Sequence, residues 1–300
     1  MKVQTVAIPG RRVGIHGQAR PAACPVCHAP ANERRSVGGK PLNGCAKCGL
    51  EWFDPPAYPH DHVDQYLSDR TSPSTYYSLS AACDRDAFDE RMRRLIEATG
   101  RRSGRVLDIG CSVGTFLEAA ASHGWDAVGV EPNAAAAAHA RARGLTVHAG
   151  FFDLALASRL GEFDAVHLSE VIEHVFDPVD LLRVATRTLR PGGVLLITTP
   201  DFGTIMARAL QRKPDEHVVH FRRSSLVKAA ESAGLEVAAA ERLSRRRSIA
   251  AMQHSTTFGA PGRALMRVLA FAPIARAVEW LLTPCFRDTL LLIARRPLNS

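Results

Sequence analysis

The stretch VLDIGCSVG, residues 106–114, decides the fold of this 300-residue chain. Its first four residues are apolar except for Asp108 and predict a buried strand, and Gly110 and Gly114 follow in a turn. A helix is expected directly after the turn, from Thr115 to Ser122. Glycines at such a turn let a ligand approach the backbone closely. A strand, a glycine turn and a helix in this order are typical of a nucleotide-binding unit in an α/β sheet.

The unit that follows adds an acid at a useful distance. Residues 127–130 predict a second strand, and Glu131 ends it, 21 positions after Gly110 (131 − 110). An acid at about this distance can hold the hydroxyls of a ribose. A pyrophosphate cofactor favours G-x-G-x-x-G, whereas this loop is G-x-x-x-G and carries Asp108 at its entry. Because a carboxylate repels pyrophosphate but attracts an ammonium and a sulfonium, the loop favours S-adenosylmethionine over NAD.

The rest of the chain continues the same alternation, which predicts an α/β fold with a doubly wound, mostly parallel sheet. Asp177 and Pro178 indicate the start of a helix that Pro191-Gly192-Gly193 should end. Ser224 is a candidate cap for a later helix that stops at Gly234. Further strands are expected at residues 194–198, 235–240 and 289–294.

These features resemble class I methyltransferases over about residues 105–234. The matching segments are 106–114, 128–132, 163–174, 189–200 and 216–221. The resemblance implies a seven-stranded sheet with an antiparallel last strand, and S-adenosylmethionine as cofactor. The cofactor-binding residues that it implies are Asp108, Gly110, Cys111 and Gly114 around the methionine part, Glu131 and Pro132 at the ribose, Phe152 and Asp153 near adenine, and Ser169 beside the methyl group.

Candidate catalytic residues follow the next predicted strand. Residues 170–174, EVIEH, resemble the E-x-x-E-H motif with which quinone-precursor and small-RNA O-methyltransferases bind Mg²⁺. Methyl transfer to a hydroxyl needs a base, and a later segment adds two histidines that could face the same cavity. The catalytic candidates are Glu173, His174, His217 and His220, and the magnesium candidates are Glu170, Glu173 and His174. The alternative is that Glu173 and His174 serve structure or acceptor contact without a metal.

Four cysteines form a separate pattern near the start of the chain. Cys24 and Cys27 make one C-x-x-C pair and Cys45 and Cys48 a second, with 17 residues between the pairs. This spacing predicts a four-thiolate zinc ribbon, in which Gly38-Gly39 turns a hairpin between the two pairs. Four thiolates leave no open coordination position, so the zinc is expected to be structural. Disulfides are the alternative, which a cytoplasmic setting disfavours.

The patterns divide the chain into four parts. Residues 1–20 are expected to be a flexible leader and 21–56 the zinc-ribbon-like module. Residues 57–100 are expected to contain a linker and an amphipathic helix. The linker-like composition extends over residues 54–77, and the helix is expected from Asp84 to Thr99. Residues 101–300 are the predicted methyltransferase domain, with a lid-like insertion at about 244–286 in which core packing is the alternative for apolar residues such as Trp280.

Charge and hydropathy restrict the partners. The chain has a formal net charge of +8, but its basic residues lie in short, scattered clusters that are typical of solvated surface, so nucleic acid is not expected. The longest apolar region, residues 264–282, is interrupted by charges and predicts no transmembrane helix. We expect a cytoplasmic protein, in which the basic and apolar insertion is the candidate for peripheral contact with the inner membrane face.

The expected function is therefore S-adenosylmethionine-dependent O-methylation. A glycan, a lipid-linked sugar or a secondary-metabolite hydroxyl is the first acceptor class, since the ribbon-plus-core arrangement resembles enzymes of such pathways. An aromatic or quinone-precursor hydroxyl is the second. The alternatives from other classes are an RNA- or protein-binding adaptor on a non-catalytic core and an oxidoreductase. Retention of Asp108, Gly110, Gly114 and Glu131 disfavours the adaptor, and the loop spacing disfavours the oxidoreductase.

Overall fold

A computed structural model describes residues 23–53, 72–210, 217–244, 277, 279–281 and 287–299. The expected leader, most of the linker and nearly all of the expected insertion lie outside these residues. Trp280 is described, and its exposed fraction of 73% is not that of a core residue. Within the described residues, no helix combines the length and the apolar character that crossing a membrane requires.

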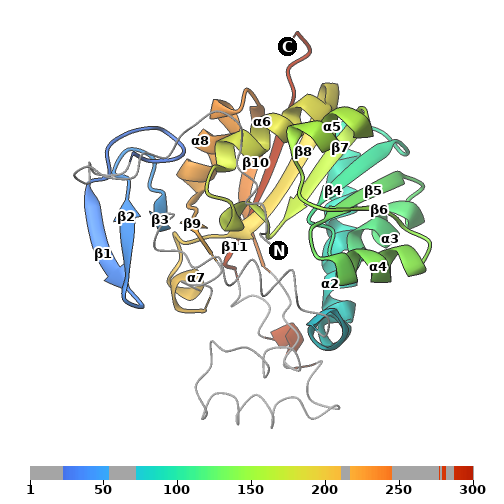
Figure 1. Cartoon of the computed structure of the whole chain (residues 1–300), viewed down its shortest axis with the longest axis horizontal. Helices are drawn as coiled ribbons and strands as arrows, with labels where there is room; N and C mark the ends of the chain where they lie inside the picture. The colour runs from blue at the N-terminus through green and yellow to red at the C-terminus, as the bar shows by residue number, and fades with distance from the viewer. Residues whose placement is uncertain are drawn as a thin grey trace, which may run out of the picture.

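A seven-stranded sheet forms the centre of the molecule (Figure 1). Its strand order is β10-β11-β8-β7-β4-β5-β6, in which β11 is antiparallel to both of its neighbours. The other pairs are parallel. The strands are β4 (Arg105–Ile109), β5 (Asp126–Glu131), β6 (Thr146–Ala149), β7 (Phe163–Ser169), β8 (Leu189–Pro200), β10 (Glu236–Leu243) and β11 (Thr289–Arg295). The predicted doubly wound sheet with its antiparallel last strand is confirmed.

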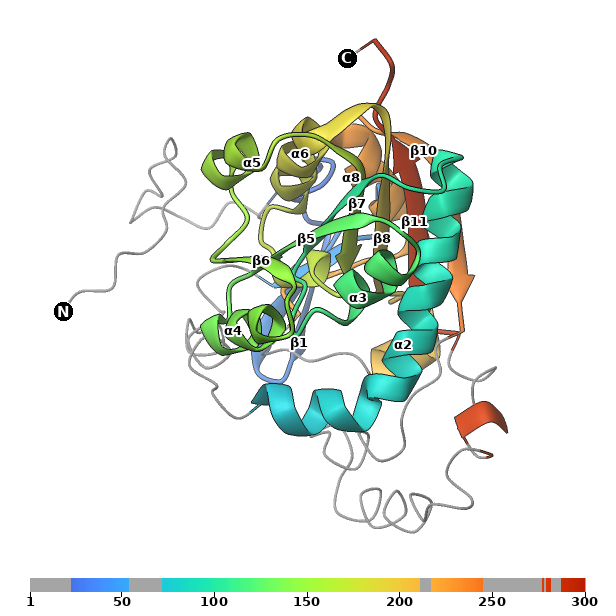
Figure 2. The same cartoon turned by 90° about the vertical axis from the view of Figure 1, so that its right-hand side faces the viewer.

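Helices cover both faces of this sheet, because alternate residues of each strand point to opposite sides. Leu107 and Ile109 of β4 pack with α5 (Leu154–Leu160), α6 (Pro178–Thr188) and α8 (Arg223–Ser232). Val106 packs on the opposite face with α2 (Ser72–Thr99) and α3 (Thr115–Ser122), as Figure 2 shows. Helix α4 (Ala134–Ala142) packs beside α3 through Ala137 and Ala140.

The cysteine module forms a second, four-stranded sheet of order β1-β2-β3-β9. Strands β1 (Glu33–Val37) and β2 (Lys40–Gly44) make a hairpin, and β3 (Glu51–Phe53) pairs with β2. Gly38 and Gly39, at φ 58° and 78°, form the two-residue turn as predicted, since such a turn needs positive φ at both positions. The fourth strand, β9 (Val219–His220), comes from the methyltransferase region.

Three predicted boundaries are wrong. Helix α2 begins at Ser72, inside the segment predicted to be linker, rather than at Asp84. Helix α6 ends at Thr188, because β8 begins at Leu189 and takes up the Pro-Gly-Gly stretch that was expected to stop the helix. Arg222, not Ser224, is the N-cap of α8. The Ser224 hydroxyl is instead used outside the helix, where it donates to the carbonyl of Cys48 at 2.8 Å.

Candidate functional site

The candidate site lies where the winding of the sheet reverses. From β4 the chain moves outward through β5 to β6, and β7 then returns to the other side of β4. In open α/β sheets, ligands bind at the carboxyl ends of the strands beside such a reversal. The glycine turn follows β4, Glu131 ends β5 and Ser169 ends β7. The fold therefore brings these predicted cofactor residues together at the carboxyl ends of the strands.

The glycine turn needs its glycines. Gly110 and Gly114 have φ of 78° and 86°, where a side chain is strained. A Cβ on Gly110 would also lie 2.5 Å from Cγ2 of Val171. The amides of Gly110 and Cys111 donate to the carbonyl of Val130 at 2.8 and 3.1 Å, which binds the turn to β5. Glycine is therefore required at both positions, by the backbone conformation and by the close packing of Val171 on Gly110 and of Leu145 on Gly114.

Glu131 holds two loops together at these strand ends. Its side chain is buried, with an exposed fraction of 1% for the residue. One carboxylate oxygen accepts from the amide of Ser112 at 2.8 Å, and the other accepts from the amide of Asn133 at 2.6 Å. A buried carboxylate with these fixed partners is preorganised to accept further hydrogen bonds from a diol.

Asp108 is buried near the end of β4 and is bonded to the neighbouring strand β7. Its carboxylate accepts from Nδ1 of His167, the register partner on β7, at 2.7 Å. The His167 ring is fully buried and stacks on Phe116, with 3.8 Å between ring centroids and 11° between planes. Sequence reasoning missed His167, although a polar residue within the apolar run of residues 163–168 marks an inward position that needs a partner.

Burial lowers the pKa of His167, against the opposing effect of Asp108, and Arg91 lowers it further. The folded protein therefore keeps this imidazole neutral at a pH where the unfolded chain, with a pKa of about 6.5, already binds a proton. Stability from this group is present above about pH 6.5 and is lost as the pH falls toward the folded pKa. The expected slope is about 1.4 kcal/mol per pH unit.

Replacing His167 by Gln should flatten this part of the pH dependence. Urea unfolding of the wild type, His167→Gln and His148→Gln between pH 7.5 and 5 measures the effect, and the exposed His148 serves as the control. An identical slope in the wild type and in His167→Gln would show that His167 does not titrate differently on folding.

Arg91 is a second residue that sequence reasoning missed. It lies on α2 with an exposed fraction of 4%, and its guanidinium donates to the hydroxyl of Ser169 at 2.7 Å. Thr198 donates to the same hydroxyl at 3.1 Å. A sequence signal was present, because Arg91 follows Phe88 by three residues and precedes Leu95 by four, which puts it on the apolar face of the helix. The fold therefore places a buried cation at the carboxyl end of β7.

The residues predicted to lie near adenine, Phe152 and Asp153, lie between β6 and α5. Phe152 is half-buried against the core, and Asp153 is the N-cap of α5, where its carboxylate accepts from the amide of Leu156 at 2.7 Å. Pro132 follows Glu131 and is half-buried. Asp153 thus has a capping task that is independent of any ligand.

A cluster of one carboxylate and two imidazoles lies beyond Ser169. Within the described residues, ligand atoms of Glu173, His174 and His217 lie within 4.8 Å of one another. Glu173 and His217 are buried and His174 is exposed. Glu173 accepts from the hydroxyl of Thr199 at 2.9 Å, and the rings of His174 and His217 are 4.9 Å apart.

The other two candidates of that region lie outside this cluster. Glu170 has a positive φ of 54° and is not among the three clustered residues. His220 is fully buried on β9, where its ring contacts Phe53 and Phe202 edge to face at 5.4 and 4.2 Å. His217 therefore lies next to Glu173 and His174 of the E-x-x-E-H segment. His220 instead packs against aromatic rings.

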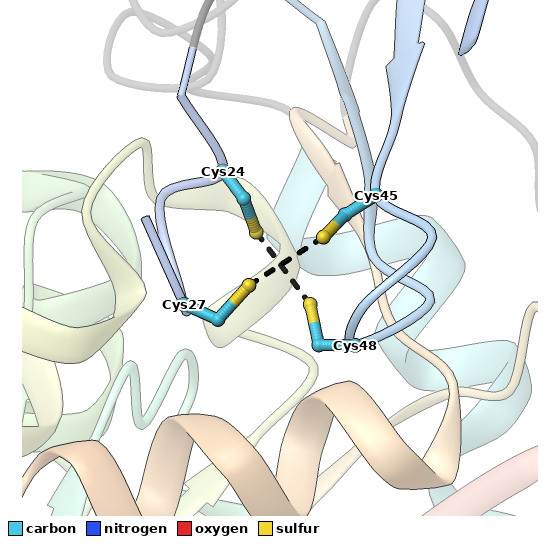
Figure 3. Close-up of side chains that lie close together, drawn as sticks. All are labelled: Cys24, Cys27, Cys45 and Cys48. Carbon is cyan, nitrogen blue, oxygen red and sulfur yellow. Dashed lines mark hydrogen bonds between the residues drawn. The ribbon is translucent and has the colours of Figure 1, made fainter. Parts of the chain in front are cut away.

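The four cysteines of the module converge, as Figure 3 shows. Their sulfur atoms lie within 4.8 Å of one another, and the Cys24–Cys48 and Cys27–Cys45 distances are 3.5 Å. A disulfide would need about 2.05 Å. Zn–S bonds of about 2.3 Å in a tetrahedron put sulfur atoms about 3.8 Å apart, so the four side chains fit a zinc ion.

The thiols of the cluster cannot all ionise without a cation. The hydrogen bond from Cys48 lowers the pKa of Cys24 to about 5, against the effect of burial. The same bond raises the pKa of Cys48 above its usual range, and burial raises it further. The pair therefore shares one proton, and a divalent cation would replace it and favour the thiolate form of both residues.

Comparison with known sequences identifies the larger part of the chain. Residues 83–240, more than half of the chain, match the family model of a methyltransferase domain. A ubiquinone biosynthesis O-methyltransferase of Methylococcus capsulatus is 31% identical over 168 residues, which cover 50% of this chain and 71% of that protein. A protein of the same name from a Caulobacter species is 35% identical over 123 residues. That match covers 39% of this chain and 48% of the relative, so the chain spans about half its length.

Solved structures share the fold. A SAM-dependent methyltransferase from Archaeoglobus fulgidus is 22% identical with a TM-score of 0.50, over 74% of this chain and 99% of that one. The plantazolicin methyltransferase BpumL in complex with SAH is 14% identical with a TM-score of 0.53, over 79% and 94%. At these identities the likeness shows the fold alone. Together with the matching family model, the sheet order establishes that the chain belongs to the class I S-adenosylmethionine-dependent methyltransferase family.

Proposed function

We propose that this chain transfers a methyl group from S-adenosylmethionine to the hydroxyl oxygen of an aromatic or quinone-precursor acceptor. The observation that best supports S-adenosylmethionine as the cofactor is the buried Glu131 carboxylate, which two backbone amides fix beside the glycine turn. The names of the relatives support the acceptor class, because they are ubiquinone biosynthesis O-methyltransferases. The glycan acceptor that the sequence put first has no such support.

The cofactor is proposed to lie across the carboxyl ends of β4, β5 and β7. Glu131 would accept from the ribose hydroxyls, with Pro132 and Phe152 beside the nucleoside and the Gly110–Gly114 turn beneath the methionine part. Arg91 is suited to the methionine carboxylate, because it is a buried cation at Ser169. Asp108, held by His167, supplies the negative charge that attracts the ammonium and the sulfonium.

When bound, S-adenosylmethionine would supply a methyl group on a sulfonium; the acceptor oxygen would form the new C–O bond in line as the S–CH₃ bond breaks and S-adenosylhomocysteine leaves. The chain must align that oxygen and take its proton. The cluster of Glu173, His174 and His217 suits this task. His217 is a candidate base, and Glu173, held by Thr199, can favour the imidazolium that forms. The same three residues offer one oxygen and two nitrogen ligands, so Mg²⁺ or a softer divalent ion would orient and acidify the hydroxyl if bound there.

Titration calorimetry of the zinc-loaded protein with S-adenosylhomocysteine, and separately with NAD, tests the cofactor assignment. We expect micromolar affinity for S-adenosylhomocysteine and no heat from NAD, because the loop pairs a carboxylate with the glycine turn. Tight NAD binding, or no binding of either compound by folded protein, would contradict the proposal.

The acceptor class is tested by transfer of labelled methyl to 3,4-dihydroxybenzoate and to a hexose glycoside. Turnover of the catechol alone is the expected result, and turnover of the glycoside alone would restore the other acceptor class. Assays with EDTA, followed by restoring Zn²⁺ alone or Zn²⁺ together with Mg²⁺, separate a base from a magnesium site, because EDTA can also remove zinc from the four cysteines. Activity that survives EDTA assigns the proton transfer to the histidines.

A further inference from the structure

The cysteine module and the acceptor side of the site share a strand. Strand β9 pairs with β3 through Glu51 opposite His220 and Trp52 opposite Val219. Figure 1 shows β9 beside β3, between the module and the larger sheet. Strand β9 directly follows His217 and Val218. Its pairing with β3 therefore fixes the backbone next to His217, a residue of the proposed acceptor site.

The contact continues through one residue into the E-x-x-E-H segment. The amide of Phe53 donates to the carbonyl of Val218 at 2.9 Å, and the amide of Val218 donates to the carbonyl of Glu173 at 2.8 Å. Val218 is thus bonded to the module on one side and to the segment of Glu173 and His174 on the other. Both bonds are fully buried around Val218, whose exposed fraction is 1%, so their loss would leave costly unpaired groups.

A second contact ties the metal-binding turn itself to the methyltransferase domain. The Ser224 hydroxyl donates to the carbonyl of Cys48 at 2.8 Å. The Glu51 carboxylate accepts from Arg35 of the module at 2.7 Å and lies 3.4 Å from the guanidinium of Arg222 at the start of α8. Contacts therefore run from the cysteine cluster to both β9 and α8.

We infer that the four-cysteine module is a positioning element for the acceptor side of the active site. Strand β3 is hydrogen-bonded to Val218 through Phe53, and Val218 is hydrogen-bonded to Glu173. These two bonds fix the distance between His217 and His174. The glycine turn, Glu131 and Arg91 make no part of this path. This inference rests on the proposed function, which identifies Glu173, His174 and His217 as the acceptor site. Changes in the module should alter the acceptor side and leave the affinity for the cofactor unchanged.

The test compares loss of the Phe53 ring alone with loss of both the ring and one hydrogen bond. Phe53→Pro deletes the amide that donates to Val218, at the last residue of β3, where the preceding Trp52 already has the extended backbone that proline requires. Phe53→Leu is the matched control, because it keeps the amide and an apolar side chain. Reaction with diethyl pyrocarbonate, followed by peptide mass spectrometry, reports the accessibility of His217, and the exposed His148 on β6, outside this path, is the internal reference.

The expected result is a rise of about tenfold in His217 modification in Phe53→Pro, with wild-type rates in Phe53→Leu. Zinc content and affinity for S-adenosylhomocysteine should match the wild type in both variants. Unchanged protection of His217 in zinc-loaded Phe53→Pro would overturn the inference.

A second pair of substitutions keeps the test decisive if Phe53→Pro does not fold. Glu51→Gln combined with Ser224→Ala loosens the second contact without touching the strand hydrogen bond, and a rise of about threefold in His217 modification is expected. No rise would also overturn the inference. Because modification needs no cofactor, a wild type that fails to bind S-adenosylhomocysteine would count against the proposed function and leave this result independent of it.

Discussion

A Glu131→Ala variant is expected to bind S-adenosylhomocysteine at least about 100-fold more weakly than the wild type. The carboxylate would make two hydrogen bonds to the ribose, and each charged hydrogen bond contributes about 1.5–3 kcal/mol. Alanine would also leave the amides of Ser112 and Asn133 without the acceptor that joins their two loops. Titration calorimetry measures the affinity, and thermal unfolding separates it from loss of folded protein.

Two controls define the origin of this effect. Glu131→Gln keeps the shape and one acceptor oxygen but removes the charge, so an intermediate loss of affinity is expected. Glu162→Ala removes an exposed acid elsewhere on the domain and should leave affinity unchanged. If Glu131→Ala bound the ligand as tightly as Glu162→Ala does, the ribose would have to lie elsewhere.

Loss of one cysteine ligand should have a comparable effect on the module. Structural zinc in four-ligand sites contributes about 10–16 kcal/mol, so the loss of one thiolate should weaken zinc binding by at least about 100-fold. We therefore expect the wild type to purify with one zinc ion per chain and Cys48→Ser to purify without stoichiometric zinc. Metal analysis and the absorption of the cobalt-substituted protein measure this difference.

Cys83→Ser is the matched control, because Cys83 is buried in α2 and does not belong to the cluster. It should retain zinc at the wild-type level. A zinc-free wild type, or a Cys48→Ser variant that keeps its zinc, would contradict a four-thiolate site.

Local patterns predicted the central sheet well. The strand before Gly110, the glycine turn and the helix over Thr115–Ser122 lie where the sequence indicates, because the change of hydrophobic period and the glycines mark both boundaries. The same is true of the Gly38-Gly39 hairpin, whose turn depends on two adjacent residues. In these two units the residues that determine the structure lie close together in the sequence, whereas the predicted Ser224 cap and the Pro-Gly-Gly helix stop were wrong although they too were local signals.

Side-chain partners were harder to predict. Asp108 was predicted from the glycine turn, but its bond to His167 was not, because His167 is 59 residues away and adjacent only once β4 and β7 pair in register. Arg91 reaches Ser169 across 78 residues for the same reason. Strand β9 is two residues long and carries no periodic signal, so its pairing with β3 depends wholly on tertiary structure.

That pairing also sets the order in which the chain can fold. The four cysteines are synthesised before β9 and would bind a zinc ion within a short loop, but the sheet of the module lacks its edge strand until β9 has been made. Ser224 and Cys48, which meet at this boundary, are 176 residues apart, so closing the loop costs more conformational entropy than any hairpin of the module does. During vectorial synthesis β3 therefore stays an open edge until most of the larger sheet has emerged, and maturation of the module waits for its neighbour.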